Sequence, residues 1–120
     1  MSTKSVAIHT AIFNLLDENS GNGGNGLDTW TDFQVGTDSN ADKIDVSSLL
    51  IGYQQGTDLS AFISIGKTDD GKAVVQIDRD GTADGFQSAD LLVLQTQTVA
   101  TQQDQIDLLN QLIANQQIIG

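Results

Sequence analysis

Residues 23–31 are the part of the chain best suited to chemistry, because they combine three glycines with an acidic side chain, Asp28. Glycine lets the backbone turn through positive φ, which can aim carbonyl oxygens inward. Together with the Asp28 carboxylate, such carbonyls would provide the oxygen ligands that a hard cation such as Ca²⁺ requires. The alternative is a glycine- and asparagine-rich surface loop, which many proteins contain.

The same nine residues match the nonapeptide G-G-x-G-x-D-x-U-x of calcium-binding parallel β-rolls, with Trp30 as the large apolar residue U. After the turn, residues 29–31 predict an extended segment that points Trp30 into the core. We expect this strand to continue through residues 32–36, with Trp30 on one face and Phe33 on the other.

Two further carboxylates follow at the separation that a roll would need. Turns on the same side of a β-roll recur after two nonapeptides, so a partner for Asp28 should lie about eighteen residues further on. Asp42 and Asp45 lie in that neighbourhood and flank the apolar Ile44. The spacing therefore predicts that Asp42 or Asp45 completes a calcium site with Asp28.

A second acidic stretch, residues 78–84, carries side-chain oxygens at alternate positions, with carboxylates at Asp78, Asp80 and Asp84 and a hydroxyl at Thr82. It lacks the glycine at the sixth position and the glutamate at the twelfth that an EF-hand loop requires, since alanines stand there. A polar hairpin turn is the favoured interpretation, and a weaker calcium site is the alternative.

The charge balance excludes several classes of partner. Sixteen acidic residues against five basic ones give a net charge of −11, so no basic patch exists for nucleic acid or for an anionic membrane surface. Bound cations would relieve the self-repulsion of such a chain. There is no cysteine for a disulfide, no apolar run long enough to cross a bilayer and no N-terminal secretory signal. We therefore expect the protein to stay in the cytosol or to leave by a route that needs no such signal.

The composition offers few residues that could support catalysis. The chain has one histidine, no cysteine and no G-x-S-x-G motif, so nucleophilic catalysis has no obvious base or nucleophile elbow. We expect no enzymatic activity.

The elements that would position these residues are mostly strands. Residues 6–16 predict one or two short strands, and residues 53–60 a loop. Residues 62–65, 72–78 and 89–96 predict strands, joined by turns at 69–71 and 80–85.

The end of the chain predicts a helix. Thr101 is a suitable N-cap with Asp104 three residues later, and Asn115 is expected to end the helix in a left-handed conformation. One apolar stripe follows the helical period, and a short apolar end comes after the helix. The stripe consists of Ile106, Leu109, Leu112 and Ile113, and the apolar end of Ile118 and Ile119.

These elements predict a single, mainly β domain over residues 1–120. A short calcium-binding parallel β-roll remnant at 6–53 would join a small antiparallel or mixed sheet at 54–98. The helix and tail at 99–120 would pack on that sheet.

Six stretches carry a resemblance to a known family: FNLLD at 13–17, GGNGLDTWTDF at 23–33, ADKIDVSSLLIGY at 41–53, IDRDGT at 77–82, LVL at 92–94 and LLNQLIANQQII at 108–119. In this order the chain resembles the C-terminal type I secretion target domain of large RTX adhesins, the repeat-built surface proteins of Gram-negative biofilm formers.

The resemblance implies an uncleaved C-terminal signal, recognised by an inner-membrane ABC transporter with its periplasmic adaptor and outer-membrane channel. The chain would leave the cell unfolded and C-terminus first, as a monomer. Calcium is scarce in the cytosol and plentiful outside, so its binding energy would become folding energy at the cell surface.

The resemblance also implies roles for particular residues. Gly24 and Gly26 would offer carbonyls and Asp28 a carboxylate, with Asp42 or Asp45 completing the site. Only one full nonapeptide is present, so several stacked calcium sites cannot form from this chain alone. The helix at 101–115 and the apolar end are the expected signal, with Ile106, Leu109, Leu112, Ile113, Ile118 and Ile119 as its apolar side chains. The alternative function is a calcium-dependent adhesion module that binds a glycan or another surface protein.

Overall fold

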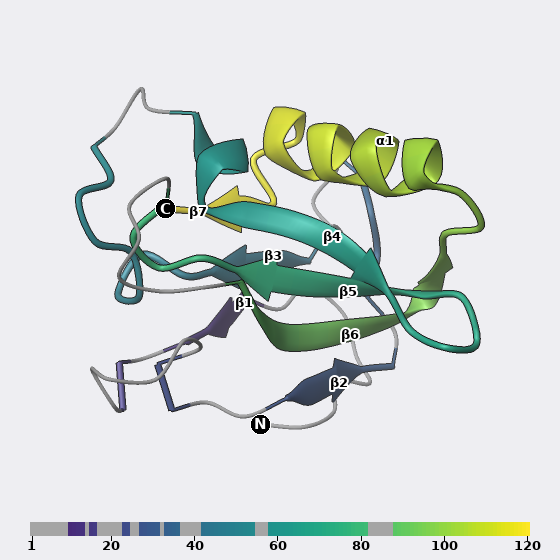
Figure 1. Ribbon diagram of the computed structural model, residues 1–120, viewed down its shortest axis with the longest axis horizontal. Coiled ribbons are helices and arrows are strands. Elements are labelled where there is room, and N and C mark those ends of the chain that lie inside the picture. Colours follow the sequence, from purple (N-terminus) through teal and green to yellow (C-terminus); the bar gives the residue numbers. More distant parts are fainter. Residues whose placement is uncertain are drawn as a thin grey trace.

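The computed structural model describes residues 10–13, 15–16, 23–24, 27–31, 33–36, 42–54, 58–81 and 88–120. Within these residues the chain forms two small sheets, one α-helix and one short 3₁₀ helix (Figure 1). The elements in chain order are β1 (Thr10–Ile12), β2 (Asp28–Trp30), β3 (Lys43–Asp45), η1 (Leu59–Ala61), β4 (Ile63–Lys67), β5 (Lys72–Ile77), β6 (Ala89–Thr98), α1 (Gln102–Ala114) and β7 (Ile118–Ile119). The fold is thus mostly strands with one C-terminal helix, as the sequence predicts.

The larger sheet has the strand order β2-β6-β5-β4, and its antiparallel part follows from local sequence. The turn between β4 and β5 places Gly71 at φ 84°, which glycine adopts without strain. Thr68 closes this turn, because its carbonyl accepts from Gly71 N at 3.0 Å and its hydroxyl from Lys72 N at 3.0 Å. The predictions of three strands and an Asp-Gly turn in this region are confirmed.

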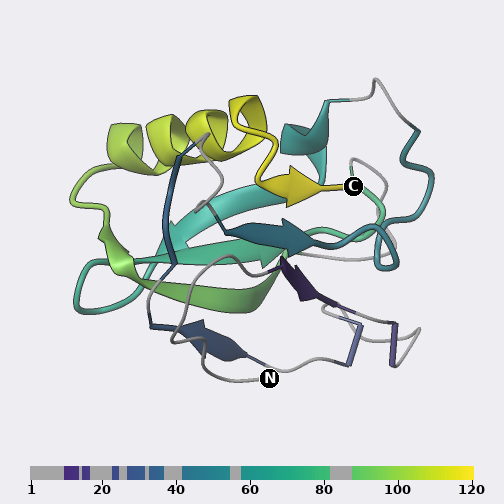
Figure 2. The same ribbon diagram turned by 180° about the vertical axis from the view of Figure 1, so that it is seen from behind.

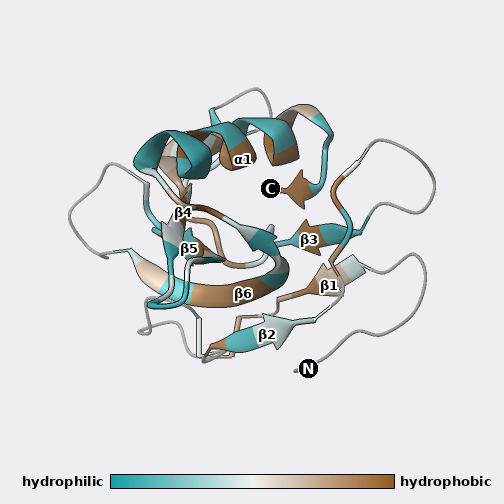
Figure 3. Cartoon of the chain, turned by 90° about the vertical axis from the view of Figure 1, so that its right-hand side faces the viewer, coloured by the Kyte–Doolittle hydropathy of each residue, from teal (hydrophilic) through white to brown (hydrophobic). Residues whose placement is uncertain are grey.

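The smaller sheet has the order β1-β3-β7, and all of its pairings are parallel (Figure 2). Strands β1 and β3 lie in this sheet and β2 lies in the other. The chain therefore passes from the smaller sheet to the larger one and then returns to the smaller one. Figure 3 shows the two sheets facing one another, with α1 across the top. The parallel pairing of β1 with β3 agrees with the coarse expectation for residues 6–53, while a calcium-binding β-roll remains a prediction.

The core lies between the sheets and includes Trp30, which is 1% exposed. Phe33 belongs to the same core, and its ring meets Trp30 edge to face at a centroid distance of 5.1 Å. The predicted continuation of the strand is therefore wrong at residues 33–36, and residue 32 lies outside the described residues. The strand ends at Trp30, and the bend at Thr31 brings both aromatic rings to one side.

The helix α1 begins as predicted and ends slightly differently. Thr101 Oγ1 accepts from Asp104 N at 3.1 Å, and the Asp104 carboxylate accepts from Thr101 N at 3.2 Å, which completes a capping box. At the other end Asn115 keeps a right-handed conformation, and Gln116 takes the positive φ of 59°. The prediction of a left-handed Asn115 was wrong by one residue.

The chain after α1 forms a strand, whereas the sequence predicted only a short apolar end. Ile118 and Ile119 form β7, which pairs in parallel with β3. The loop predicted at 53–60 also gains structure, since η1 begins at Leu59 with Asp58 as its N-cap. Strand β4 lies directly under α1, and Gln105 Nε2 donates to Ile65 O at 3.0 Å (Figure 1).

Candidate functional site

The glycine turn of the nonapeptide has the backbone that its sequence predicts. Gly23 and Gly24 adopt φ values of 69° and 84°, and Gly23 O accepts from Leu16 N at 2.8 Å. Asp28 begins β2 and is half-buried, while Gly26 lies outside the described residues. The left-handed turn is confirmed at the first two glycines, and the calcium site itself remains a prediction.

The three carboxylates of the predicted site belong to different surroundings. Asp28 lies in β2, which pairs with β6, whereas Asp45 lies in β3, between β1 and β7. Asp45 Oδ1 accepts from Ser47 N at 3.0 Å and from Ser47 Oγ at 2.6 Å, so it serves the turn that follows β3.

Asp42 is more buried, at 4% exposure, and its Oδ2 accepts from Gln34 N at 2.9 Å. Among the described residues, no three acidic or histidine side chains gather in a group that could hold a metal ion. Asp28, Asp42 and Asp45 therefore form no such group of three, and a site made of Asp28, glycine carbonyls and either Asp42 or Asp45 remains a prediction.

The second acidic stretch forms a tight turn after β5. Asp78 N donates to Phe62 O at 2.7 Å, and Gly81 N donates to Asp78 O at 3.1 Å. Gly81 has φ 64°, and a Cβ atom there would lie 3.0 Å from the Phe62 ring. Asp84 lies outside the described residues. A turn at Asp78–Gly81 agrees with the favoured sequence interpretation.

Within this turn the ionised form of the Asp78 carboxyl is disfavoured. Its Oδ1 is buried and has no hydrogen-bond partner in the described part of the chain. Burial raises the pKa of Asp78 above its ordinary value, and the hydrogen bond and negative charge of Asp80 raise it further. Two adjacent carboxyl groups in such surroundings can be stabilised either by a proton or by a bound cation.

Arg79, between these two acids, turns its side chain into the protein. It is 2% exposed, its Nε donates to Leu49 O at 2.9 Å, and its carbonyl accepts from Ile51 N at 2.7 Å. The guanidinium thereby fixes the segment that follows β3. Sequence reasoning missed this role, because a lone arginine in an acidic turn suggests a solvated charge.

The predicted signal residues differ in how far they are buried. Leu109, Leu112 and Ile118 are buried, and Ile113 and Ile119 are half-buried. Ile106, in contrast, is 46% exposed, and Leu108 occupies the buried face that the predicted stripe assigned to Ile106. Most of the side chains that would form the signal thus pack inside the folded domain.

Gln117 is a further residue of this region that sequence reasoning missed. It is 0% exposed although it is polar, and its amide bonds to backbone groups of Gln34, Gly36 and Asp42. No pattern distinguishes it from the neighbouring Gln116, which is exposed.

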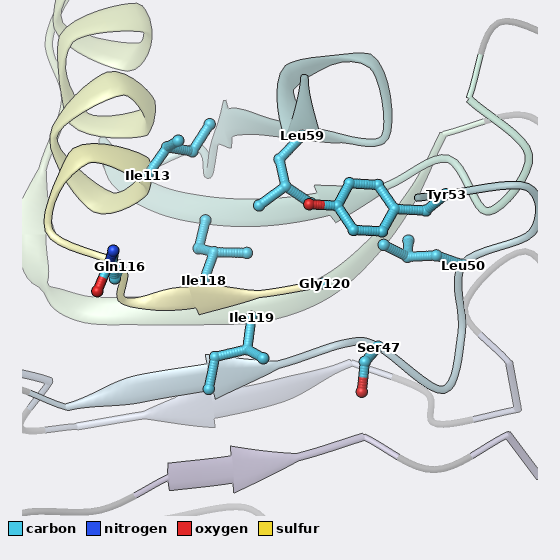
Figure 4. Close-up of a pocket in the computed structure, with 9 residues that line it drawn as sticks. All are labelled: Ser47, Leu50, Tyr53, Leu59, Ile113, Gln116, Ile118, Ile119 and Gly120. Carbon is cyan, nitrogen blue, oxygen red and sulfur yellow. The ribbon is translucent and has the colours of Figure 1, made fainter. Parts of the chain in front are cut away.

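A groove of about 610 Å³ lies beside β7, between the end of α1 and the segment after β3 (Figure 4). It is lined by Ser47, Leu50, Tyr53, Leu59, Ile113, Gln116, Ile118, Ile119 and Gly120. None of these side chains is charged, which contrasts with the strongly acidic chain as a whole. The groove can therefore accept an uncharged group.

The chain matches no known protein family, no curated protein and no solved structure. Among the described residues, no helix has the length and apolar character needed to cross a membrane.

Proposed function

We propose that this chain is the uncleaved C-terminal type I secretion signal domain of a large RTX adhesin. In this proposal it leaves the cell unfolded and folds on binding Ca²⁺ outside, where it remains associated with the cell surface. Its partners are an ABC transporter, a periplasmic adaptor and an outer-membrane channel. The domain acts as a monomer and has no catalytic role.

The observation that carries the proposal is the burial of the C-terminal tail. Leu112 and Gln117 are both 0% exposed, and Ile118 is 4% exposed within a strand that pairs with β3. A transporter that reads these side chains can do so only before the domain folds. A signal of this kind requires a domain that stays unfolded in the cytosol and folds later.

Calcium provides the difference between the two compartments. An excess of acidic residues, giving a net charge of −11, disfavours the compact state when no cation is bound. A ligand that binds only the folded state adds its binding free energy to the free energy of folding. The candidate ligands are the nonapeptide, with Gly24, Gly26 and Asp28, and the acidic turn with Asp78 and Asp80. The buried Oδ1 of Asp78 favours the acidic turn.

Export from a cell that carries a type I system tests the signal directly. A reporter protein fused to this chain should be exported, and deletion of residues 101–120 should abolish that export. Trp30→Ala is the matched control, because it damages the folded core without altering the tail. Export of the Trp30 variant should continue, since an unfolded chain is the proposed substrate. Undiminished export after the deletion would contradict the proposal.

Circular dichroism tests the calcium dependence separately. Purified protein freed of metal by a chelator should change from disordered to β-rich as Ca²⁺ rises to extracellular levels. Mg²⁺ at the same concentration is the control, since it prefers octahedral sites with several waters. A spectrum that is β-rich in chelator and indifferent to Ca²⁺ would refute the folding switch.

A calcium-dependent ligand-binding module is the second candidate function, and the groove in Figure 4 favours it. Tyr53 lines this groove and packs edge to face on Phe62 at 5.5 Å, which holds its ring in place. Binding to a glycan array in Ca²⁺ that is lost with Tyr53→Ala would support this function. The absence of any binding in Ca²⁺ would count against it.

A further inference from the structure

The Gln117 side chain is fully buried, and its amide makes four hydrogen bonds. Nε2 donates to Gln34 O at 2.9 Å and to Asp42 O at 2.7 Å. Oε1 accepts from Gly36 N at 3.0 Å and from Asn115 Nδ2 at 3.1 Å. A primary amide has two donor hydrogens and one oxygen with two lone pairs, so the Gln117 side chain is fully satisfied.

Three of these four partners are backbone groups of Gln34, Gly36 and Asp42, and Gln34 and Asp42 also bond to each other. Asp42 N donates to Gln34 O at 3.2 Å, and Gln34 N donates to Asp42 Oδ2 at 2.9 Å. The two carbonyls that accept from Gln117 are those of the same pair. The amide therefore fits its surroundings only when Gln34 and Asp42 are together.

The backbone of Gln117 also connects the tail to both neighbouring elements. Its carbonyl accepts from Ile44 N at 2.7 Å, and its N–H donates to Leu112 O at 2.9 Å. A buried amide without partners is strongly unfavourable, so loss of the four side-chain bonds would favour undocking of the tail as a unit. Docking of β7 and the pairing of Gln34 with Asp42 thus depend on a single side chain.

We propose that Gln117 is a latch that couples docking of the C-terminal tail, residues 115–120, to the pairing of Gln34 with Asp42. Such coupling is reciprocal, so separating Gln34 from Asp42 must loosen the tail by the same free energy as loss of the tail separates the pair. Its consequence for export rests on the function proposed above. In a chain that leaves C-terminus first, the tail emerges early and stays undocked until residues 34–46 have followed.

Hydrogen–deuterium exchange of the full chain tests the latch, with Gln117→Glu as the first variant. Glutamate keeps the shape and the acceptor oxygens, but as a carboxylate it cannot donate to the two carbonyls. Protection of amides in 115–120 and in 33–36 and 42–46 should fall together, by about ten- to a hundredfold, while β4, β5 and β6 stay protected. Gln111→Glu, on the exposed face of α1, is the matched control and should leave all three regions unchanged.

A second experiment tests the coupling in the opposite direction, by altering Asp42 and measuring the tail. Asp42→Ala removes the carboxylate that accepts from Gln34 N, and the tail at 115–120 should lose protection although it is not altered. A tail that stays protected in this variant overturns the proposal. The same conclusion follows if Gln117→Glu loosens the tail and leaves 33–36 and 42–46 protected.

A third variant covers the case in which Gln117→Glu unfolds the whole domain. Asn115→Ala removes a single bond to the Gln117 oxygen and should loosen the same two segments to a smaller extent. Loss of protection confined to the neighbourhood of residue 115 would overturn the latch. If the coupling is found and export survives deletion of residues 101–120, the latch stands and the secretion proposal fails.

Discussion

The antiparallel strands β4, β5 and β6 and the parallel sheet β1-β3-β7 enclose the same core, but they depend on opposite kinds of contact. The hairpin of β4 and β5 closes over a short turn at Gly71, so its register follows from neighbouring sequence. The parallel sheet joins strands that begin at Thr10, Lys43 and Ile118, with most of the chain between the last two. Closing such long loops costs conformational entropy that only tertiary contacts offset.

The difference explains where folding of this domain can be controlled. A region with local contacts can form whenever its own residues are present. The parallel sheet requires three distant segments at once, and its last strand is also part of the proposed secretion signal. Conditions that weaken the domain should therefore release the tail before they separate β4 from β5.

The largest loss of unfolding free energy should come from Ile44→Ala, in the middle strand of the parallel sheet. Ile44 is 0% exposed, and deletion of a buried isoleucine to alanine typically costs about 2–5 kcal/mol of unfolding free energy. Urea denaturation measures the loss, and tail-specific exchange should rise first. Lys43→Ala, at the exposed neighbouring position, is the control and should change the free energy by about 0.5 kcal/mol or less. Equal losses for the two variants would contradict the role given to β3.

The same contrast decides how much the sequence could predict. Strands β4, β5 and β6, the turn at Gly71 and the capping box at Thr101 all follow from short-range patterns, and they are found nearly where those patterns predict them. Parallel pairing leaves no turn signal, so neither the strand at Ile118–Ile119 nor its partner could be read from the sequence.

Residues whose roles depend on distant backbone groups were missed for the same reason. The Gln117 amide bonds to carbonyls 83 and 75 residues away, and Arg79 bonds to a carbonyl 30 residues away. Phe33 was assigned to the wrong face, because the end of β2 at Trp30 depends on packing across the two sheets. The pattern did not predict the turn contacts of two candidate carboxylates, Asp42 with Gln34 and Asp45 with Ser47.

A pair of glycine substitutions sharpens the account of the local turns. Gly81→Ala combines a left-handed backbone with a new Cβ 3.0 Å from the Phe62 ring, so it should cost about 1–3 kcal/mol of unfolding free energy. Gly52→Ala, at φ +78° with no atom within 4 Å of the new Cβ, isolates the backbone contribution of about 1–2 kcal/mol. Thermal unfolding compares the two. A Gly52 variant as damaging as the Gly81 variant would show that the Phe62 contact is unimportant.

Removing the capping box should have a more modest effect, because it acts only on the first turn of α1. Thr101→Ala leaves Asp104 N without its side-chain acceptor and should cost about 1 kcal/mol. Thermal unfolding of the variant measures this cost. Thr101→Ser keeps the hydroxyl and should recover most of the loss. If the serine and alanine variants were equally unstable, the cap would not be the cause.

The smallest effect concerns the acidic turn, where protonation and cation binding compete. The pKa of Asp78 is raised, chiefly by burial and then by Asp80, so folding favours the protonated carboxyl. This contribution to stability is complete below the unfolded-state pKa and is lost as the pH rises through the folded-state pKa.

Asp78→Asn keeps a neutral side chain at every pH and should escape that loss. In chelator its thermal midpoint, relative to the parent chain, should rise slightly from acidic to neutral pH, by less than the effect of the Thr101 cap. Added Ca²⁺ should reverse the order at neutral pH, since only the parent chain has both carboxylates to bind it. The opposite result would be a thermal midpoint of Asp78→Asn that falls relative to the parent chain in chelator as the pH rises. It would mean that the Asp78 anion stabilises the fold and that the acidic turn needs no cation.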